Sequence, residues 1–252
     1  MSGHSKWTQI KRKKSATDEK RGRMFSKLLR AIEVAAREGG ANVEGNMTLA
    51  SAVQKARDYS VPVDNIERAI KRAAGETGAA QYQDVTYEGY GPGGVAVLVE
   101  AMTDNRNRTG QEVRHAFSRM GGTLGDPGSV AWMFHRKGLI VVEKGLAPEE
   151  DRLLEIILEA GAEDLRDSGE HWEVVTPPEA LVSVRKALEE AGVQFVSAEL
   201  TMLSGTEVPV ASDRAESVLR LIEALEDLED VQNVYSNFEI PEEVLADGLT
   251  LI

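Results

Sequence analysis

Lysine and arginine are concentrated at the start of this chain of 252 residues. Residues 1–75 contain 16 Lys and Arg against 8 Asp and Glu, and 10 of the 16 fall within the first 30 positions. Such side chains neutralise phosphates and release counterions, which supplies affinity for a polyanion without choice of sequence. Residues 76–252, with 13 Lys and Arg against 34 Asp and Glu, would repel nucleic acid. We therefore expect contact on one defined face, the alternative being that these charges are simply solvated.

The main candidates for contact with a nucleic-acid strand lie in residues 1–22 and in the helix predicted to follow. Residues 1–22 lack a periodic apolar pattern, which indicates an extended or flexible arm. The aromatic residue of the arm, Trp7, could stack on a base or pack on the helical domain, and the sequence leaves both open. The basic candidates are Lys6, Lys11, Arg12, Lys13, Lys14, Lys20 and Arg21 in the arm, and Arg23, Lys27 and Arg30 in the helix.

A second polar segment, residues 103–109, follows a predicted strand and opens a predicted helix. Asp104 is expected to cap that helix, where its negative charge suits the helix dipole. Arg106 and Arg108 are then free to face outward, and a second contact with an anion is predicted there. Helix capping accompanied by two solvated arginines is the alternative.

The residue types needed for catalysis or metal binding form no recognisable pattern. The chain has no cysteine, which excludes disulfides, thiolate metal sites and a thiol nucleophile. The four histidines have no HExxH spacing, and no serine stands in a GxSxG elbow. The Gly-rich residues 87–94 lack the GK[ST] ending of a P-loop and precede a strand, so a structural turn is favoured. We expect no enzyme, no catalytic residue, no metal and no cofactor.

The chain also lacks the sequence features of a membrane protein. No stretch approaches the roughly 20 apolar residues that a membrane span needs. The basic N-terminus has no apolar run of the kind found in signal peptides. Absence of cysteine fits a reducing compartment. A cytoplasmic protein without membrane contact is therefore expected.

Apolar residues at helical spacing predict three helices in the first part of the chain. The first is expected to end at Gly39-Gly40. The third is expected to begin with Asp64 as its N-cap and Glu67 as its capping-box partner, and to end at Gly75. These helices predict a small N-terminal domain.

Strands and amphipathic helices alternate from about residue 84 onward, with short connections between them. The pattern predicts an α+β fold, in which the three-helix domain is followed by two small α/β (ferredoxin-like) sandwiches. The expected strands are 95–99, 130–134, 139–142, 172–175, 195–203 and 231–238. The expected helices are 106–120, 149–160, 178–191 and 211–228.

The chain contains six short motifs, each once and in a fixed order. They are Gly3-His4-Ser5-Lys6-Trp7, Arg21-Gly22-Arg23-Met24-Phe25, Tyr87–Gly94, Thr103–Thr109, Gly121-Gly122-Thr123-Leu124-Gly125 and Gly128-Ser129-Val130-Ala131-Trp132. Together they resemble the YebC family, which includes PmpR-type regulators and a mitochondrial translational activator. The resemblance runs from residue 2 to about residue 240. It implies three domains, namely 1–79, a discontinuous 80–135 plus 203–240, and an inserted acidic 136–202.

The resemblance also implies a function. Members of the family are described as probable DNA-binding transcriptional regulators, and others act in translation, where bacterial ones relieve ribosomes stalled at proline runs. The expected partners are therefore DNA or RNA, with the ribosome as an alternative, and the sequence does not choose between them. One departure concerns Val63, which stands where the family often has a lysine and so removes one phosphate contact.

Overall fold

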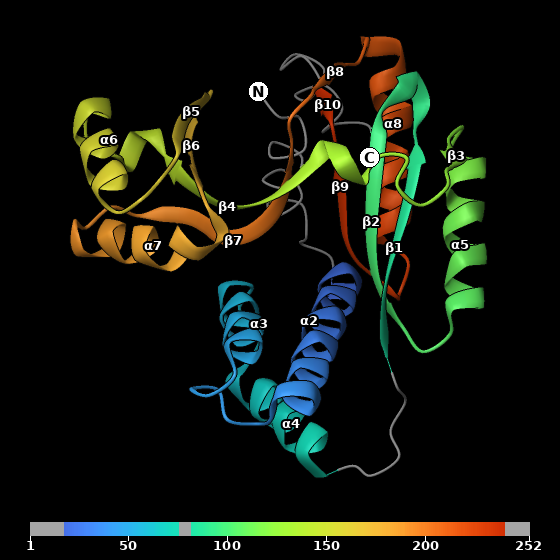
Figure 1. The fold of residues 1–252 in the computed structure, drawn as a ribbon, viewed down its shortest axis with the longest axis horizontal. Coiled ribbons are helices and arrows are strands. Elements are labelled where there is room, and N and C mark those ends of the chain that lie inside the picture. Colours follow the sequence, from blue (N-terminus) through green and yellow to red (C-terminus); the bar gives the residue numbers. More distant parts are fainter. Residues whose placement is uncertain (1–17, 76–81, 240–252) are drawn as a thin grey trace.

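The computed structural model describes residues 18–75 and 82–239 of the chain. Figure 1 shows three groups of elements: helices at the bottom of the view, one sheet with its helices on the right, and a second sheet with its helices on the left. The expected α+β fold is confirmed. Among the described helices, none has the length and apolar character needed to cross a bilayer.

Three helices form the N-terminal group, α2 (Asp18–Gly39), α3 (Met47–Asp58) and α4 (Val63–Gly75). Their apolar faces meet in one core, where the Ile32 side chain is fully buried. The first of them ends at the predicted glycine pair, because Gly40 has a φ of +89°.

The start of α2 differs from the prediction. It begins at Asp18, so Lys20 and Arg21, which were assigned to an extended arm, are helical. Asp, Glu, Lys and Arg dominate this stretch, and they extend a helix into solvent without any apolar periodicity. A prediction based on periodicity alone therefore places the start too late.

The capping box predicted at Asp64 was wrong. The helix α4 begins one residue earlier, at Val63, and Asp64 already lies in its first turn. The carbonyl of Pro62 accepts hydrogen bonds from the N–H groups of Asn65 and Ile66. The fixed φ of proline favours such a helix start, so no side-chain cap is needed there.

The first sheet is antiparallel and has the strand order β3-β1-β2-β9. Two helices, α5 and α8, pack on one face of it. The strands are β1 (Gln83–Tyr90), β2 (Ala96–Thr103), β3 (Thr123–Leu124) and β9 (Val231–Ser236), and the helices are α5 (Arg106–Arg119) and α8 (Ser212–Glu226).

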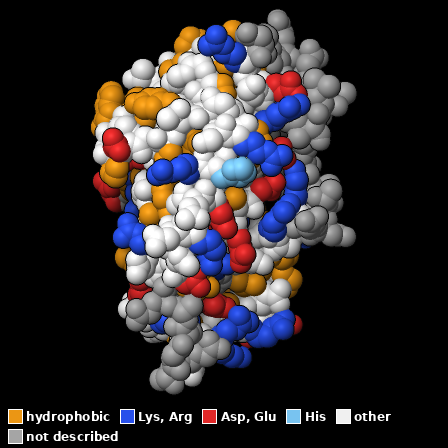
Figure 2. Space-filling view, turned by 90° about the vertical axis from the view of Figure 1, so that its right-hand side faces the viewer, with side chains coloured by type: hydrophobic (Ala, Val, Ile, Leu, Met, Phe, Trp, Pro, Cys, Tyr) orange, Lys and Arg blue, Asp and Glu red, His pale blue; other side chains and the backbone are white. Residues whose placement is uncertain are grey.

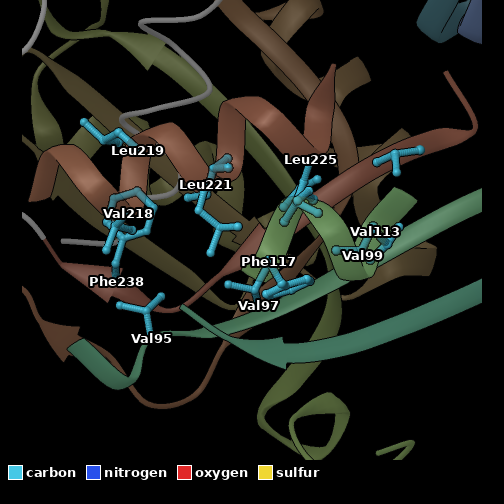
Figure 3. Close-up of a cluster of buried hydrophobic side chains, with 14 of the residues drawn as sticks. Val95, Val97, Val99, Val113, Phe117, Val218, Leu219, Leu221, Leu225 and Phe238 are labelled. Atoms are coloured by element: carbon cyan, nitrogen blue, oxygen red, sulfur yellow. The ribbon is translucent and has the colours of Figure 1, made fainter. Parts of the chain in front are cut away.

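Apolar side chains form the main core between this sheet and its helices. Figure 3 shows Val97 of β2 near Phe117 of α5, with Leu221 and Leu225 of α8 nearby. Gly89 of β1 lies directly against α5, where a Cβ atom would come within 2.7 Å of the Phe117 ring. Glycine is therefore required there to seat α5 on the sheet.

The second sheet is also antiparallel and has the order β5-β6-β4-β7. Its elements follow one another as β-α-β-β-α-β, which is the ferredoxin-like arrangement. The first sheet instead begins with the hairpin β1-β2. The elements are β4 (Phe134–Glu143), α6 (Glu150–Glu159), β5 (Asp164–Ser168), β6 (His171–Thr176), α7 (Leu181–Glu190) and β7 (Phe195–Ser204).

Several short elements lie between the longer helices and strands. The strands β8 (Val208–Pro209) and β10 (Phe238–Glu239) form a parallel pair beside the first sheet. The single-turn 3₁₀ helices are η1 (Pro92–Gly94), η2 (Ala131–Met133), η3 (Lys144–Leu146) and η4 (Pro178–Ala180).

The strand predicted for residues 130–134 was wrong. This segment forms η2, and a strand begins only at Phe134. The buried carboxylate of Glu88 accepts the backbone N–H groups of Val130 and Ala131, both at 2.7 Å. These bonds turn the chain, because they occupy donors that a sheet ladder would need.

Candidate nucleic-acid interface

The cations of α2 face the acidic C-terminal end of α8 and the turn after it. Lys20 pairs with Glu223, and the hydrogen bond between them raises the pKa of Lys20. Arg23 lies 3.6 Å from the carboxylate of Asp227. We call the acidic residues of this segment the α8 acidic end; they are Glu223, Glu226, Asp227, Glu229 and Asp230.

Two further α2 cations reach the same segment. Lys27 donates a hydrogen bond to the backbone carbonyl of Glu226 at 2.5 Å. Arg30 pairs with Glu229 at 2.9 Å and with Asp230 at 3.0 Å. The structure therefore brings together four predicted nucleic-acid contacts, but it engages them with groups of the same chain. Figure 2 shows basic and acidic side chains lying beside one another on the side of the molecule that it views.

Asp230 is the most buried member of the α8 acidic end. Its side chain is 3% exposed. Besides Arg30, it accepts hydrogen bonds from the hydroxyls of Thr103 at 3.0 Å and Thr109 at 2.7 Å, and from Arg108 at 2.6 Å. Burial opposes ionisation, but the bonds from Arg108, Thr109 and Thr103 outweigh it and hold the pKa of Asp230 below its ordinary value.

The start of α5 corrects two predictions. Its N-cap is Asn105, whose side-chain oxygen accepts the N–H of Arg108, and not Asp104. Asp104 instead pairs with the Arg108 guanidinium at 3.0 Å. Arg108 is therefore not free to face a ligand, and its hydrogen bond to Asp230 is the main cause of its raised pKa. Arg106 is exposed, and its carbonyl accepts a hydrogen bond from the Tyr87 hydroxyl at 3.3 Å.

The remaining candidates divide between α2 and the arm. Arg21 lies over the ring of Phe25, 5.3 Å from its centroid. The other candidates fall outside the described residues, so their predicted contacts stay predictions. They are Lys6, Trp7, Lys11, Arg12, Lys13 and Lys14.

Sequence reasoning missed two buried carboxylates that organise this region, Asp230 and Glu88. Asp230 stands among other acidic residues, and Glu88 lies in the Gly-rich motif Tyr87–Gly94, which was interpreted as a structural turn. Their partners come from segments far away in the chain, as in the pair of Asp230 with Arg30, 200 residues apart. No local signal could have revealed them.

Glu88 supports the loop between β3 and β4. Its carboxylate accepts N–H groups from Gly128 at 2.6 Å and from Val130 and Ala131. Burial raises the pKa of Glu88, but these three bonds outweigh it and lower it overall. The carboxylate therefore stays ionised and holds the loop in place.

Replacing Glu88 with glutamine should lower the free energy of unfolding by about 1–3 kcal/mol, because an amide group turns a donor toward backbone donors. Urea unfolding followed by circular dichroism measures this change. Glu112→Gln serves as the control, since Glu112 is only half-buried and lies on α5. Equal midpoints for the Glu88 variant and the unmodified protein would contradict the role given to this carboxylate.

The described residues contain no group of three or more His, Asp or Glu side chains placed to hold a metal ion. The chemistry that these residues display is ion pairing and hydrogen bonding. Arginine and lysine side chains that pair with carboxylates also suit phosphate, because both partners are oxygen anions.

Two family models match the chain. The one described as "TACO1/YebC protein N-terminal domain" matches residues 5–76, and the one described as "TACO1/YebC second and third domain" matches residues 82–238.

Relatives and a solved structure agree with the family models. A "Probable transcriptional regulatory protein" of Thermobifida fusca is 54% identical over 247 residues, 98% of this chain and 99% of that protein. One of Mycolicibacterium smegmatis is 55% identical over 247 residues, 98% of each chain. The crystal structure of the conserved hypothetical protein Aq1575 from Aquifex aeolicus has a TM-score of 0.79 and 48% identity, and the match covers 90% of this chain and 94% of that one. This chain belongs to the TACO1/YebC family.

Proposed function

We propose that the chain is a non-enzymatic, cytoplasmic, DNA-binding regulator of transcription that grips the phosphate backbone with its basic N-terminal segment. One observation carries the proposal: 10 of the 29 Lys and Arg residues lie in the first 30 positions of a chain with a net charge of −13. Such a concentration of positive charge favours binding to a polyanion. The relatives named probable transcriptional regulatory proteins support DNA as that polyanion.

The pairing of α2 with the α8 acidic end suggests how DNA would bind: its phosphates would replace carboxylates as partners of the α2 cations. Phosphate and carboxylate compete for the same guanidinium and ammonium groups. Lys20 and Arg23 are 43% and 41% exposed in their pairs, so a strand can reach them by displacing Glu223 and Asp227. Arg30 is 13% exposed and stays with Asp230. The arm then binds first, and the outer cations of α2 extend the contact.

Removing the competing carboxylates should strengthen DNA binding. In Glu223→Gln with Asp227→Asn, the ion pairs of Lys20 with Glu223 and of Arg23 with Asp227 are removed. The slope of log affinity against log salt should steepen by about 0.9 for each cation released to a phosphate. Stability should change little, because exposed pairs contribute only about 0–1 kcal/mol. Fluorescence anisotropy with a DNA duplex at several salt concentrations measures the slope.

A matched control uses carboxylates that pair elsewhere on the surface. Glu155→Gln with Glu190→Gln removes the same charge from the pairs with Arg152 and Lys186 in the second sheet region. If lower negative charge on the protein were enough to strengthen DNA binding, affinity for DNA would rise equally in both double variants. Equal gains would therefore contradict a specific competition at the α8 acidic end.

Footprinting on promoter DNA tests the proposed function. Protection of a defined site that survives excess competitor DNA supports a transcriptional regulator. Uniform binding to every duplex counts against it. Sedimentation of the full-length protein with ribosomes, together with failure to protect promoter DNA, would replace the proposal with a role in translation.

A further inference from the structure

Helix α5 carries positive charge in an otherwise acidic part of the chain. It contains four arginines and a single acidic residue, Glu112. Residues 76–252 as a whole contain 13 Lys and Arg against 34 Asp and Glu. A basic helix in such surroundings cannot be attributed to general composition, so its charge needs a specific explanation.

Three of these arginines, Arg106, Arg114 and Arg119, are exposed. No ion pair within residues 18–75 and 82–239 includes any of them. The fourth, Arg108, is held by Asp104 and Asp230. The structure thus separates one arginine that fastens α5 from three that present their guanidinium groups to solvent.

The orientation of α5 is fixed by its buried face. Val113 and Phe117 are completely buried against the first sheet. The three exposed arginines are spread around the helix: at about 3.6 residues per turn, Arg114 and Arg119 lie on either side of the surface opposite the core, and Arg106 lies at the N-terminal end of the helix. Arg106 and Arg114 are eight residues apart, about 12 Å along the axis, and Arg119 lies about 7.5 Å further on. Exposed hydrogen-bonding side chains lie between them: Asn107, Gln111, His115 and Ser118.

The exposed positions of α5 include no Phe, Tyr or Trp. Single-stranded nucleic acid is usually held by aromatic side chains on which unpaired bases stack. Exposed arginines with amides and hydroxyls between them instead suit the phosphates of a duplex, whose bases remain stacked. The helix also lies at the outer edge of the molecule, on the right of Figure 1, with no other labelled element beyond it.

We propose that the exposed surface of α5 is a second surface for duplex DNA, with Arg106, Arg114 and Arg119 binding the phosphate backbone. This inference rests on the proposed DNA-binding function and adds a contact remote from the basic arm. Together the arm and α5 would allow one molecule to hold a duplex at two places, which increases affinity through effective concentration.

The test replaces all three arginines with glutamine in the full-length chain. A fluorescein-labelled, mixed-sequence DNA duplex is titrated at several salt concentrations. The slope of log affinity against log salt should become shallower by about 2–3, since each lost phosphate contact removes about 0.9. The melting temperature should stay the same, because the three side chains are exposed and form no ion pair with a described carboxylate.

The matched control is the triple variant Arg152→Gln, Arg166→Gln, Lys186→Gln, which makes the same charge change at exposed sites in the second sheet region. Equal slopes for the two triple variants would overturn the inference, because net charge alone would then explain the loss. If the α5 variant has the same salt slope as the unmodified protein, the inference is overturned too. The proposed function would still stand in that case, because the unmodified protein binds DNA. Absence of DNA binding by the unmodified protein would defeat both. A greater loss for single-stranded than for duplex DNA would also overturn the assignment.

Discussion

Asp230→Ala is expected to lower the free energy of unfolding by about 3–5 kcal/mol, the range for removing one partner of a buried ion pair. The substitution leaves Arg30, which is only 13% exposed, without its buried anion. It also removes the carboxylate that accepts from the buried hydroxyls of Thr103 and Thr109, although the Thr109 hydroxyl keeps the Asn105 carbonyl as an acceptor. Thermal unfolding followed by circular dichroism measures the loss. Because Asp230 joins α2 to the first sheet, the contact between them should loosen as well.

Asp227→Ala is the matched control for Asp230→Ala. Asp227 lies three residues earlier, but its side chain is 45% exposed, and its pair with Arg23 spans 3.6 Å. Exposed pairs contribute about 0–1 kcal/mol, so this variant should melt close to the unmodified protein. If the two variants melt together, the buried network around Asp230 is not stabilising.

The contribution of Asp230 should also depend on pH in a defined direction. Its hydrogen bonds lower its pKa in the folded protein below the ordinary value of 3.8. The stabilisation is therefore complete above that ordinary value and is lost as the pH falls through the lowered pKa. The difference in melting temperature between Asp230→Ala and the unmodified protein should be largest at neutral pH. It should become smaller in strong acid. A difference that stays the same in strong acid would contradict a stabilising role for the ionised Asp230 carboxylate.

Replacing four consecutive cations of the arm should have the largest effect on DNA binding. The residues are Lys11, Arg12, Lys13 and Lys14, each changed to alanine. If about six phosphates are neutralised, log affinity for a duplex should fall with log salt at a slope of about −5, and the variant should flatten it by about 3–4. Fluorescence anisotropy with duplex DNA at several salt concentrations measures the slope. The melting temperature should hardly change.

The control again matches the change of charge. Arg152, Arg166, Lys186 and Arg220, each changed to alanine, remove four cations from exposed sites outside the arm. Their loss should leave the slope near that of the unmodified protein. A collapse of the melting temperature in the arm variant would mean that these lysines and the arginine are structural, and the proposed grip on phosphate would then fail.

Much of the fold followed from apolar periodicity. The predicted helix 106–120 became α5, and the predicted strand 195–203 became β7. Among the longer strands, β1 and β5 were missed, for opposite reasons. The end of β1 was interpreted as part of a Gly-rich turn, because its glycines resemble turn residues. In the structure, Gly89 instead allows α5 to pack closely on the strand. β5 is an edge strand with little buried surface, so its sequence lacks an apolar signal.

The candidate interface was less predictable than the fold. Charge segregation identified the cationic segment, but it could not show that Lys20 and Arg30 face carboxylates of the same chain. Those pairings depend on how α8 packs on the first sheet, which brings together segments about 200 residues apart. Arg108 shows the same limit, since its role as a fastening residue depends on Asp230.

The long separation between Arg30 and Asp230 has a consequence for the protein while it is being made. Arg30 is synthesised 200 residues before the carboxylate that receives it. At roughly 5–20 residues per second, translation needs about 10–40 s to span that interval. Throughout that time the newly made α2 carries its cations without their final counter-charges. A nascent chain thus passes through a stage in which it attracts polyanions more strongly than the finished molecule does.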